Sequence, residues 1–230
     1  MRAWIEHSTR FLESAVDIGP RALVLLAVLL LIPAYIFPLW NMTMFAPQYP
    51  EGLRLDIYSY KLGGGNGGLD VREVNVLNHY IGMRDLTTES FTEFKWIPFV
   101  VGALGLLFLR SVLHGTMAGL VDVTVMYVYF ALFSLWSFGF KLYTYGHDLD
   151  PKAAVTVPGF MPPLFGYRKI ANFEVYSYPG PASYAMGAVL AFLLAALFLA
   201  WRQFRRGAAP PAAAGAPAAA RTAAAAPARG

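Results

Sequence analysis

Cysteine is absent from this chain of 230 residues. Disulfide bonds, thiolate metal ligands and covalent haem attachment through a Cys-x-x-Cys-His motif are therefore excluded. The side-chain metal ligands that remain are imidazole, thioether and carboxylate groups. A metal site would therefore have to be built from histidine, methionine and the acidic residues.

Charge is also scarce. Charged residues make up 14% of the sequence, against 57% hydrophobic residues and a mean hydropathy of +0.48. A soluble domain of this length would need roughly twice that share of charge to cover its surface. The formal net charge of +4 belongs mostly to arginines beside hydrophobic runs, which indicates contact with the anionic head groups of a lipid bilayer. No soluble segment combines a basic face with interleaved aromatic residues, so nucleic-acid binding is not expected.

The sequence contains four long hydrophobic runs. A hydrocarbon core about 30 Å thick needs roughly 20 apolar residues per helix. On this basis the sequence predicts an all-α membrane protein with four transmembrane helices, at residues 22–40, 96–113, 115–140 and 183–201. Acidic residues precede the first run and no small-x-small cleavage site follows it, so we expect a retained helix rather than a signal peptide.

Two long loops separate these runs, at residues 41–95 and 141–182. An even number of spans lies between them, so both loops should face the same side of the membrane. Arg21, Arg110 and the group Arg202, Arg205 and Arg206 lie close to the spans on the other side. The positive-inside rule then predicts a bacterial inner-membrane protein with cytoplasmic N- and C-termini and two periplasmic loops.

The two ends of the chain have their own character. Residues 1–21 are predicted to form an amphipathic helix at the cytoplasmic surface. Residues 202–230 contain little besides alanine, proline, glycine and arginine after the membrane-flanking arginines, which predicts a disordered tail.

The loops are expected to form a small periplasmic cap. In the first loop, Leu53, Leu55 and Ile57 alternate with polar residues, and residues 71–77 form a second β-rich stretch. The glycine-rich residues 63–68 lie between them and match G-x-G-x-x-G literally, but no crossover helix or acidic ribose partner follows. We therefore predict a β-hairpin with a glycine tip, followed by a short helix near residues 88–95. The second loop is rich in proline and is expected to be an ordered, extended cover.

Each loop carries one histidine in a polar setting. His79 and Met83 are four residues apart in the first loop, and His147 is followed by Asp148 and Asp150 in the second. Imidazole with thioether suits Cu(I), and imidazole with carboxylate suits Cu(II) or zinc, so copper is the candidate cofactor. No established zinc spacing is present. The alternative is structural: both histidines would bond to loop backbone and the aspartates would cap turns.

Motifs for enzymatic chemistry are missing. There is no Gly-x-Ser-x-Gly nucleophile elbow and no phosphate-binding loop, so an enzyme is not predicted. Asp122 lies within the third run, where an acidic residue is either functional or close to the membrane interface, and the sequence does not assign it a role.

Several unusual stretches of the chain resemble a known family. They are Phe37-Pro38-Leu39-Trp40, Ala46-Pro47-Gln48-Tyr49-Pro50-Glu51-Gly52-Leu53, Leu77-Asn78-His79-Tyr80-Ile81-Gly82-Met83, Gly146-His147-Asp148-Leu149-Asp150-Pro151 and Pro162-Pro163-Leu164-Phe165-Gly166. The similarity is to small membrane proteins that accompany bacterial nitrous oxide reductase gene clusters, especially the atypical Sec-exported type. It spans about residues 30–180.

This resemblance implies a role in maturing, supplying copper to, or delivering electrons to a periplasmic copper enzyme, with a periplasmic or membrane protein as partner. It implies no catalytic residues. Two alternatives stay open. One is a membrane anchor in an electron-transfer chain that contacts quinol through aromatic residues such as Trp136, Phe138 and Tyr143. The other is a purely structural scaffold.

Overall fold

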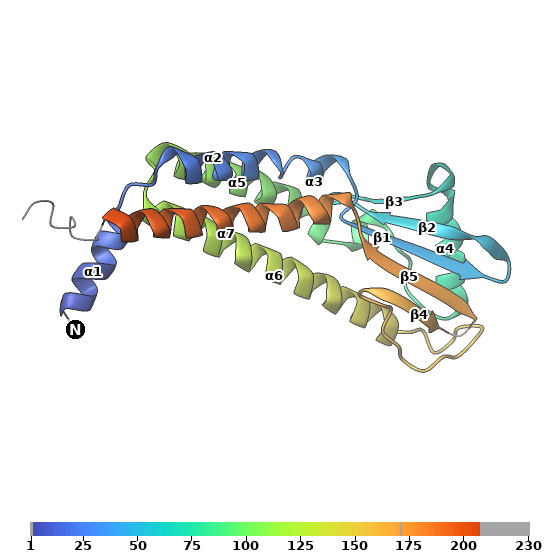
Figure 1. The fold of residues 1–230 in the computed structure, drawn as a ribbon. Helices are drawn as coiled ribbons and strands as arrows, with labels where there is room; N and C mark the ends of the chain where they lie inside the picture. Colours follow the sequence, from blue (N-terminus) through green and yellow to red (C-terminus); the bar gives the residue numbers. More distant parts are fainter. Residues whose placement is uncertain (1, 171, 208–230) are drawn as a thin grey trace, which may run out of the picture.

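The computed structural model describes residues 2–170 and 172–207. A bundle of long helices carries a β-sheet at one end and the short helix α1 (Arg2–Glu13) at the other, as Figure 1 shows. The bundle consists of α2 (Ile18–Leu29) with α3 (Pro33–Ile36), α5 (Glu93–His114), α6 (Met117–His147) and α7 (Pro181–Gly207).

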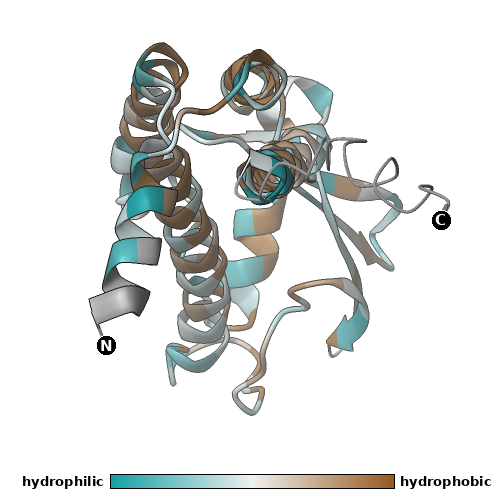
Figure 2. Ribbon diagram, turned by 60° about the vertical axis from the view of Figure 1, so that its left-hand side comes forward, coloured by the Kyte–Doolittle hydropathy of each residue, from teal (hydrophilic) through white to brown (hydrophobic). Residues whose placement is uncertain are grey.

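Four segments of the described chain are long and apolar enough to cross a membrane, which confirms the predicted number. They are Ile18–Ile36, Glu93–His114, Met117–His147 and Pro181–Gly207. Figure 2 shows that hydrophobic residues dominate these helices and that hydrophilic residues gather toward their ends. By length and composition, the chain is a multi-pass membrane protein.

The helix boundaries differ from the predicted ones at several places, and two of these lie next to the β-sheet. The first helical span ends at Ile36, and Trp40 already begins a strand. The third span continues past residue 140 to His147. Its 31 residues extend about 46 Å at 1.5 Å per residue, longer than a hydrocarbon core of about 30 Å. The helix α6 is therefore longer than a span of the hydrocarbon core requires, and its last turns lie beside the sheet.

The helices pack through small and branched side chains. Helix α2 lies against both α5 and α7, and its Ala27 is fully buried, as is Ala196 of α7. Phe108 of α5 and Tyr127 of α6 fill the centre, with ring centroids 6.0 Å apart. At the end away from the sheet, α1 contacts α7 through an edge-to-face pair of Phe11 and Phe204. Residues 202–230 were predicted to be a disordered tail. Residues 202–207 instead form the end of α7, and residues 208–230 lie outside the described residues.

A five-stranded antiparallel sheet joins the two loops. Its order is β3-β2-β1-β5-β4. The strands are β1 (Trp40–Ala46), β2 (Tyr49–Ile57), β3 (Leu62–Gly64), β4 (Gly166–Ile170) and β5 (Phe173–Pro179). The central pairing aligns Met42 of the first loop with Ser177 of the second. The sequence predicted one β-hairpin in this region, whereas the structure has five strands. The proline-rich loop contributes two of them, which its sequence did not reveal.

The predicted hairpin is partly wrong. Leu53, Leu55 and Ile57 do form a strand, but residues 71–77 lie in the helix α4 (Leu69–Tyr80). Val74 and Leu77 are buried on one face of α4, and their spacing of three residues is typical of a helix. The β-branched residues of this stretch favour a strand by residue type. The strand β2 pairs instead with β1 on one side and with the short β3, which includes Gly63 and Gly64, on the other. We refer to the sheet and α4 together as the cap.

A buried carboxylate holds α4 on the sheet. Asp70 is buried, and its Oδ2 accepts a hydrogen bond from the backbone N–H of Arg54 (2.8 Å) while its Oδ1 accepts one from Asn66 Nδ2 (2.7 Å). The hydroxyl of Tyr49 also donates to Glu73 of α4, and this bond raises the pKa of Tyr49. Asp70 thus fixes three elements at once: β2, the glycine-rich turn and α4.

Replacing Asp70 with alanine should therefore loosen the cap. We expect Asp70→Ala to cost about 1–3 kcal/mol of cap stability, because two donors lose their partner in a buried setting. The measurement is the rate of tryptic cleavage within the cap of detergent-solubilised protein, which should rise severalfold. Glu51→Ala, at an exposed position of β2, is the control and should leave the rate unchanged. Equal rates for the two variants would contradict this role of Asp70.

Candidate functional site

A polar cleft of about 880 Å³ lies where the two loops meet on the cap. Its walls are the end of α4 with the residues that follow it, up to Asp85, and the segment from Asp148 to Ala154. We call it the cap cleft. Two backbone hydrogen bonds hold its walls together, from Asp150 N–H to the Gly82 carbonyl (2.8 Å) and from Val155 N–H to the Tyr80 carbonyl (3.1 Å).

Gly82 is required at the closest approach of the two walls. Its φ of +79° lies in the left-handed region, and a Cβ there would lie 2.7 Å from the carbonyl oxygen of Asp150. Within the Gly82-Met83 motif, the glycine is thus needed for the second loop to pack against the end of α4.

Four of the five predicted metal ligands line the cap cleft. They are His79, Met83, Asp148 and Asp150. His79 is exposed and its imidazole makes no hydrogen bond to any described residue, whereas Met83 is half-buried. The carboxylates have other partners: Asp148 forms an ion pair with Arg84, and Asp150 Oδ1 accepts a hydrogen bond from the backbone N–H of Lys152 (2.8 Å). Asp150 therefore caps its turn, as the structural alternative proposed.

His147 lies apart from the other four. It is the last residue of α6, its Nδ1 donates to the Tyr143 carbonyl (2.9 Å), and its ring stacks on Tyr143 with centroids 3.9 Å apart. The other side of the imidazole approaches Gly159, and His147 is not among the residues that line the cap cleft. Within residues 2–170 and 172–207, no three histidine or acidic side chains are arranged to hold a metal ion. The candidate metal donors at the cleft therefore reduce to His79 and Met83.

A second hollow lies between the cap and the bundle, and sequence reasoning missed it. This junction cavity has a volume of about 400 Å³ and an almost wholly apolar lining. Met42 and Leu55 of the sheet line it, together with Ile97 of α5, Phe138 of α6 and Met186 of α7. No sequence motif could have located it, because its walls come from all parts of the chain and each wall residue is an ordinary apolar residue.

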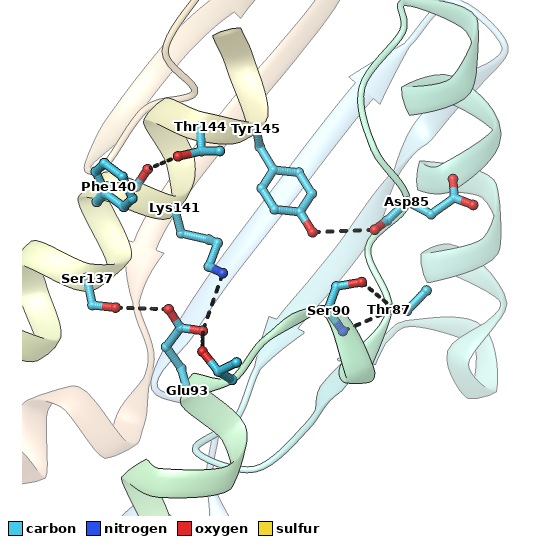
Figure 3. A network of polar contacts seen from close by, with 10 residues as sticks. Asp85, Thr87, Ser90, Glu93, Ser137, Phe140, Lys141, Thr144 and Tyr145 are labelled. Atoms are coloured by element: carbon cyan, nitrogen blue, oxygen red, sulfur yellow. Dashed lines mark hydrogen bonds and ion pairs between the residues drawn. The ribbon is translucent and has the colours of Figure 1, made fainter. Parts of the chain in front are cut away.

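A polar network borders this cavity, as Figure 3 shows. Glu93, at the start of α5, lies 3.5 Å from Lys141 Nζ of α6 and accepts a hydrogen bond from Ser137 Oγ (2.9 Å). The Lys141 ammonium also lies over the ring of Phe91, 5.3 Å from its centroid. Nearby, the Tyr145 hydroxyl donates to the Asp85 carbonyl (3.4 Å). The network ties α5, α6 and the loop before α5 together next to the sheet.

Two buried polar groups of the cavity lining have no hydrogen-bond partner in the described chain. They are Nδ2 of Asn78, at the end of α4, and Oγ of Ser134 on α6. Buried polar groups are nearly always paired, so each of these needs an explanation.

The aromatic residues of the quinol alternative do not gather at one place. Phe138 lines the junction cavity and packs against Trp40, with ring centroids 5.1 Å apart. Trp136 is 61% exposed and stacks on Phe140 of its own helix, and Tyr143 stacks on His147. Asp122 is exposed near the start of α6, at the end of the bundle away from the cap.

No known protein family, curated protein or solved structure matches this chain.

The pair of Glu93 and Lys141 gives a testable energetic prediction. Lys141→Met should destabilise the protein by about 1–3 kcal/mol, because Glu93 then keeps a charge in a largely apolar setting without its cation. Thermal unfolding in detergent measures the effect, with Lys95→Met at an exposed position of the same region as control. The double variant Glu93→Gln, Lys141→Met should recover part of the loss. If Lys141→Met unfolds at the same temperature as Lys95→Met, the pair contributes nothing to stability.

Proposed function

We propose that this chain is an accessory protein of a periplasmic copper enzyme, in a bacterial inner membrane, and that its cap cleft holds a copper ion as cargo. The observation that carries the proposal is the presence of His79 and Met83 in one cleft at the meeting point of both loops. The protein itself carries out no catalytic step in this proposal. It presents copper to a protein partner that docks on the cap.

The donor set supports copper over other metals. A neutral imidazole and a thioether are the side chains that favour Cu(I) when thiolates are absent, and this chain has no cysteine. Two donors leave the coordination of the ion incomplete. Such an open site suits an ion that is transferred to another protein. The partner can supply a third ligand before the first two ligands release the ion.

The resemblance to proteins that accompany nitrous oxide reductase gene clusters supports the identity of the system. The stretches that carry this resemblance include Leu77-Asn78-His79-Tyr80-Ile81-Gly82-Met83 and Gly146-His147-Asp148-Leu149-Asp150-Pro151. Each contributes residues to one wall of the cap cleft, the second from Asp148 onward. The proposed partner is therefore a periplasmic copper enzyme of that kind or a protein that assembles it.

The proposed orientation places the cap in the periplasm and both termini in the cytoplasm. Support comes from the basic residues at the end of the bundle opposite the cap. Arg205 lies over the ring of Trp201, 4.9 Å from its centroid, and Arg202 lies 5.7 Å from that of Phe198. Tryptophan is typical of both membrane interfaces, whereas arginine beside a span is typical of the cytoplasmic side.

The copper proposal is tested by Cu(I) titration of the purified protein in detergent with a chromogenic competitor. We expect the double variant His79→Ala, Met83→Leu to lose at least tenfold in affinity, which corresponds to about 1.4 kcal/mol. His147→Ala is the matched control, because its imidazole lies outside the cleft and bonds to its own helix. Unchanged affinity in the double variant, or an equal loss in His147→Ala, would refute copper binding at the cleft.

The orientation is tested by cysteine labelling, for which the cysteine-free chain provides a clean background. Lys152→Cys in the wall of the cap cleft and Arg206→Cys at the end of α7 both replace exposed residues. A membrane-impermeant maleimide added to spheroplasts should label the first variant and spare the second until the membrane is opened. The reverse pattern would place the cap in the cytoplasm and end the proposal.

A further inference from the structure

The junction cavity has the features of a small-molecule site. Its volume of about 400 Å³ falls within the range of about 300–1,000 Å³ that is common for ligand pockets. Ligand pockets combine a mainly apolar lining with a few convergent polar groups, and this cavity has both.

The two unpaired groups of the lining determine which polar atoms a ligand must carry. Asn78 is 4% exposed and belongs to the lining, and its Nδ2 has hydrogens to donate but no acceptor in the described chain. Ser134 Oγ, on the α6 side of the same cavity, is in the same position. A buried polar group without a hydrogen-bond partner is unfavourable, because it has lost its contact with water and gained none in return. A ligand with two acceptor oxygens on an apolar frame would satisfy both.

The charges at the cavity favour a neutral ligand. Glu93 and Lys141 both border it, and their charges cancel within a 3.5 Å ion pair. The ammonium therefore gives no unbalanced positive charge to bind a fatty-acid carboxylate or a lipid phosphate. A neutral head with carbonyl oxygens meets no such penalty.

The cavity also reaches the surface that faces the bilayer. Leu135 of α6 and Gly187 of α7 both line it, and both are exposed at the surface of the bundle. Figure 1 shows α6 diverging from α7 toward the sheet. Because Leu135 and Gly187 belong both to the cavity lining and to the exposed surface, they mark an opening of the cavity. An apolar tail attached to a bound ring could leave through this opening into the hydrocarbon.

We propose that the junction cavity binds a neutral isoprenoid quinone. The ring occupies the cavity, its two carbonyl oxygens accept hydrogen bonds from Asn78 Nδ2 and Ser134 Oγ, and its tail passes between α6 and α7. The proposal concerns binding alone and is independent of copper at the cap cleft.

The test uses decylubiquinone added to the protein in phosphatidylcholine nanodiscs, followed by quenching of tryptophan fluorescence. Trp40 lines the cavity and reports on a quinone bound there. We expect saturable quenching by the wild-type protein. Asn78→Leu, which removes the donor at nearly constant volume, should weaken binding about tenfold, as expected for one lost hydrogen bond.

A cavity-filling variant provides a second, independent arm. A Cβ at Gly187 meets no atom within 4 Å, so Gly187→Leu should be tolerated by the fold while it blocks the opening. This variant should lose saturable quenching. Gly139→Leu is the matched control, since Gly139 on α6 also has open space around it but does not line the cavity.

Three results would overturn the proposal. The first is equal affinity in Asn78→Leu and the wild type, and the second is undiminished binding in Gly187→Leu. The third is displacement of the quinone by decylbenzene, which has the ring and tail but no carbonyl oxygens. That result would make the cavity a site for any apolar chain.

Discussion

The pairing of β1 with β5 is the interaction on which the rest of the structure depends. These two strands continue directly from the first span and into the fourth, and their register runs from Trp40 opposite Pro179 to Phe45 opposite Glu174. At the membrane boundary, Gly180 N–H donates to the Leu39 carbonyl (2.7 Å). A Cβ at Gly180 would lie 2.2 Å from the Pro38 carbonyl oxygen, so only glycine allows this approach. The sheet is therefore an extension of two membrane helices and not a separate domain on a linker.

This central pair explains why both hollows exist. The remaining strands and α4 are arranged around it, so the sheet covers the end of the bundle and leaves the junction cavity beneath it. The loop after α6 then closes on the end of α4 and forms the cap cleft. Met83 lines both hollows, and it is the one predicted ligand that does so. The two hollows thus share one wall residue, and the other predicted ligands lie away from the junction cavity.

The membrane part of the fold was predictable because hydrophobic length is a one-dimensional signal. The same argument placed His79 and the Asp148–Asp150 turn on one side, and the structure brings them to one cleft. The helical state of α4 was missed because Val71, Val74 and Val76 favour a strand by residue type, whereas burial of Val74 and Leu77 against the sheet decides for a helix. The separation of His147 was not predictable either. It depends on α6 continuing for nearly two turns past the predicted end of the span at residue 140, so that its last residue bonds to its own helix.

The edges of the sheet restrict how another protein can approach it. At one edge, β3 has only three residues, and two of them are glycines. At the other, β4 carries Arg168 and Lys169 side by side, and both are exposed. Short strands and basic side chains at an edge discourage a foreign strand from adding to the sheet. A protein that recognises this surface must therefore do so with side chains on a preformed face, and the sheet is at the same time protected from edge-to-edge aggregation in a crowded compartment.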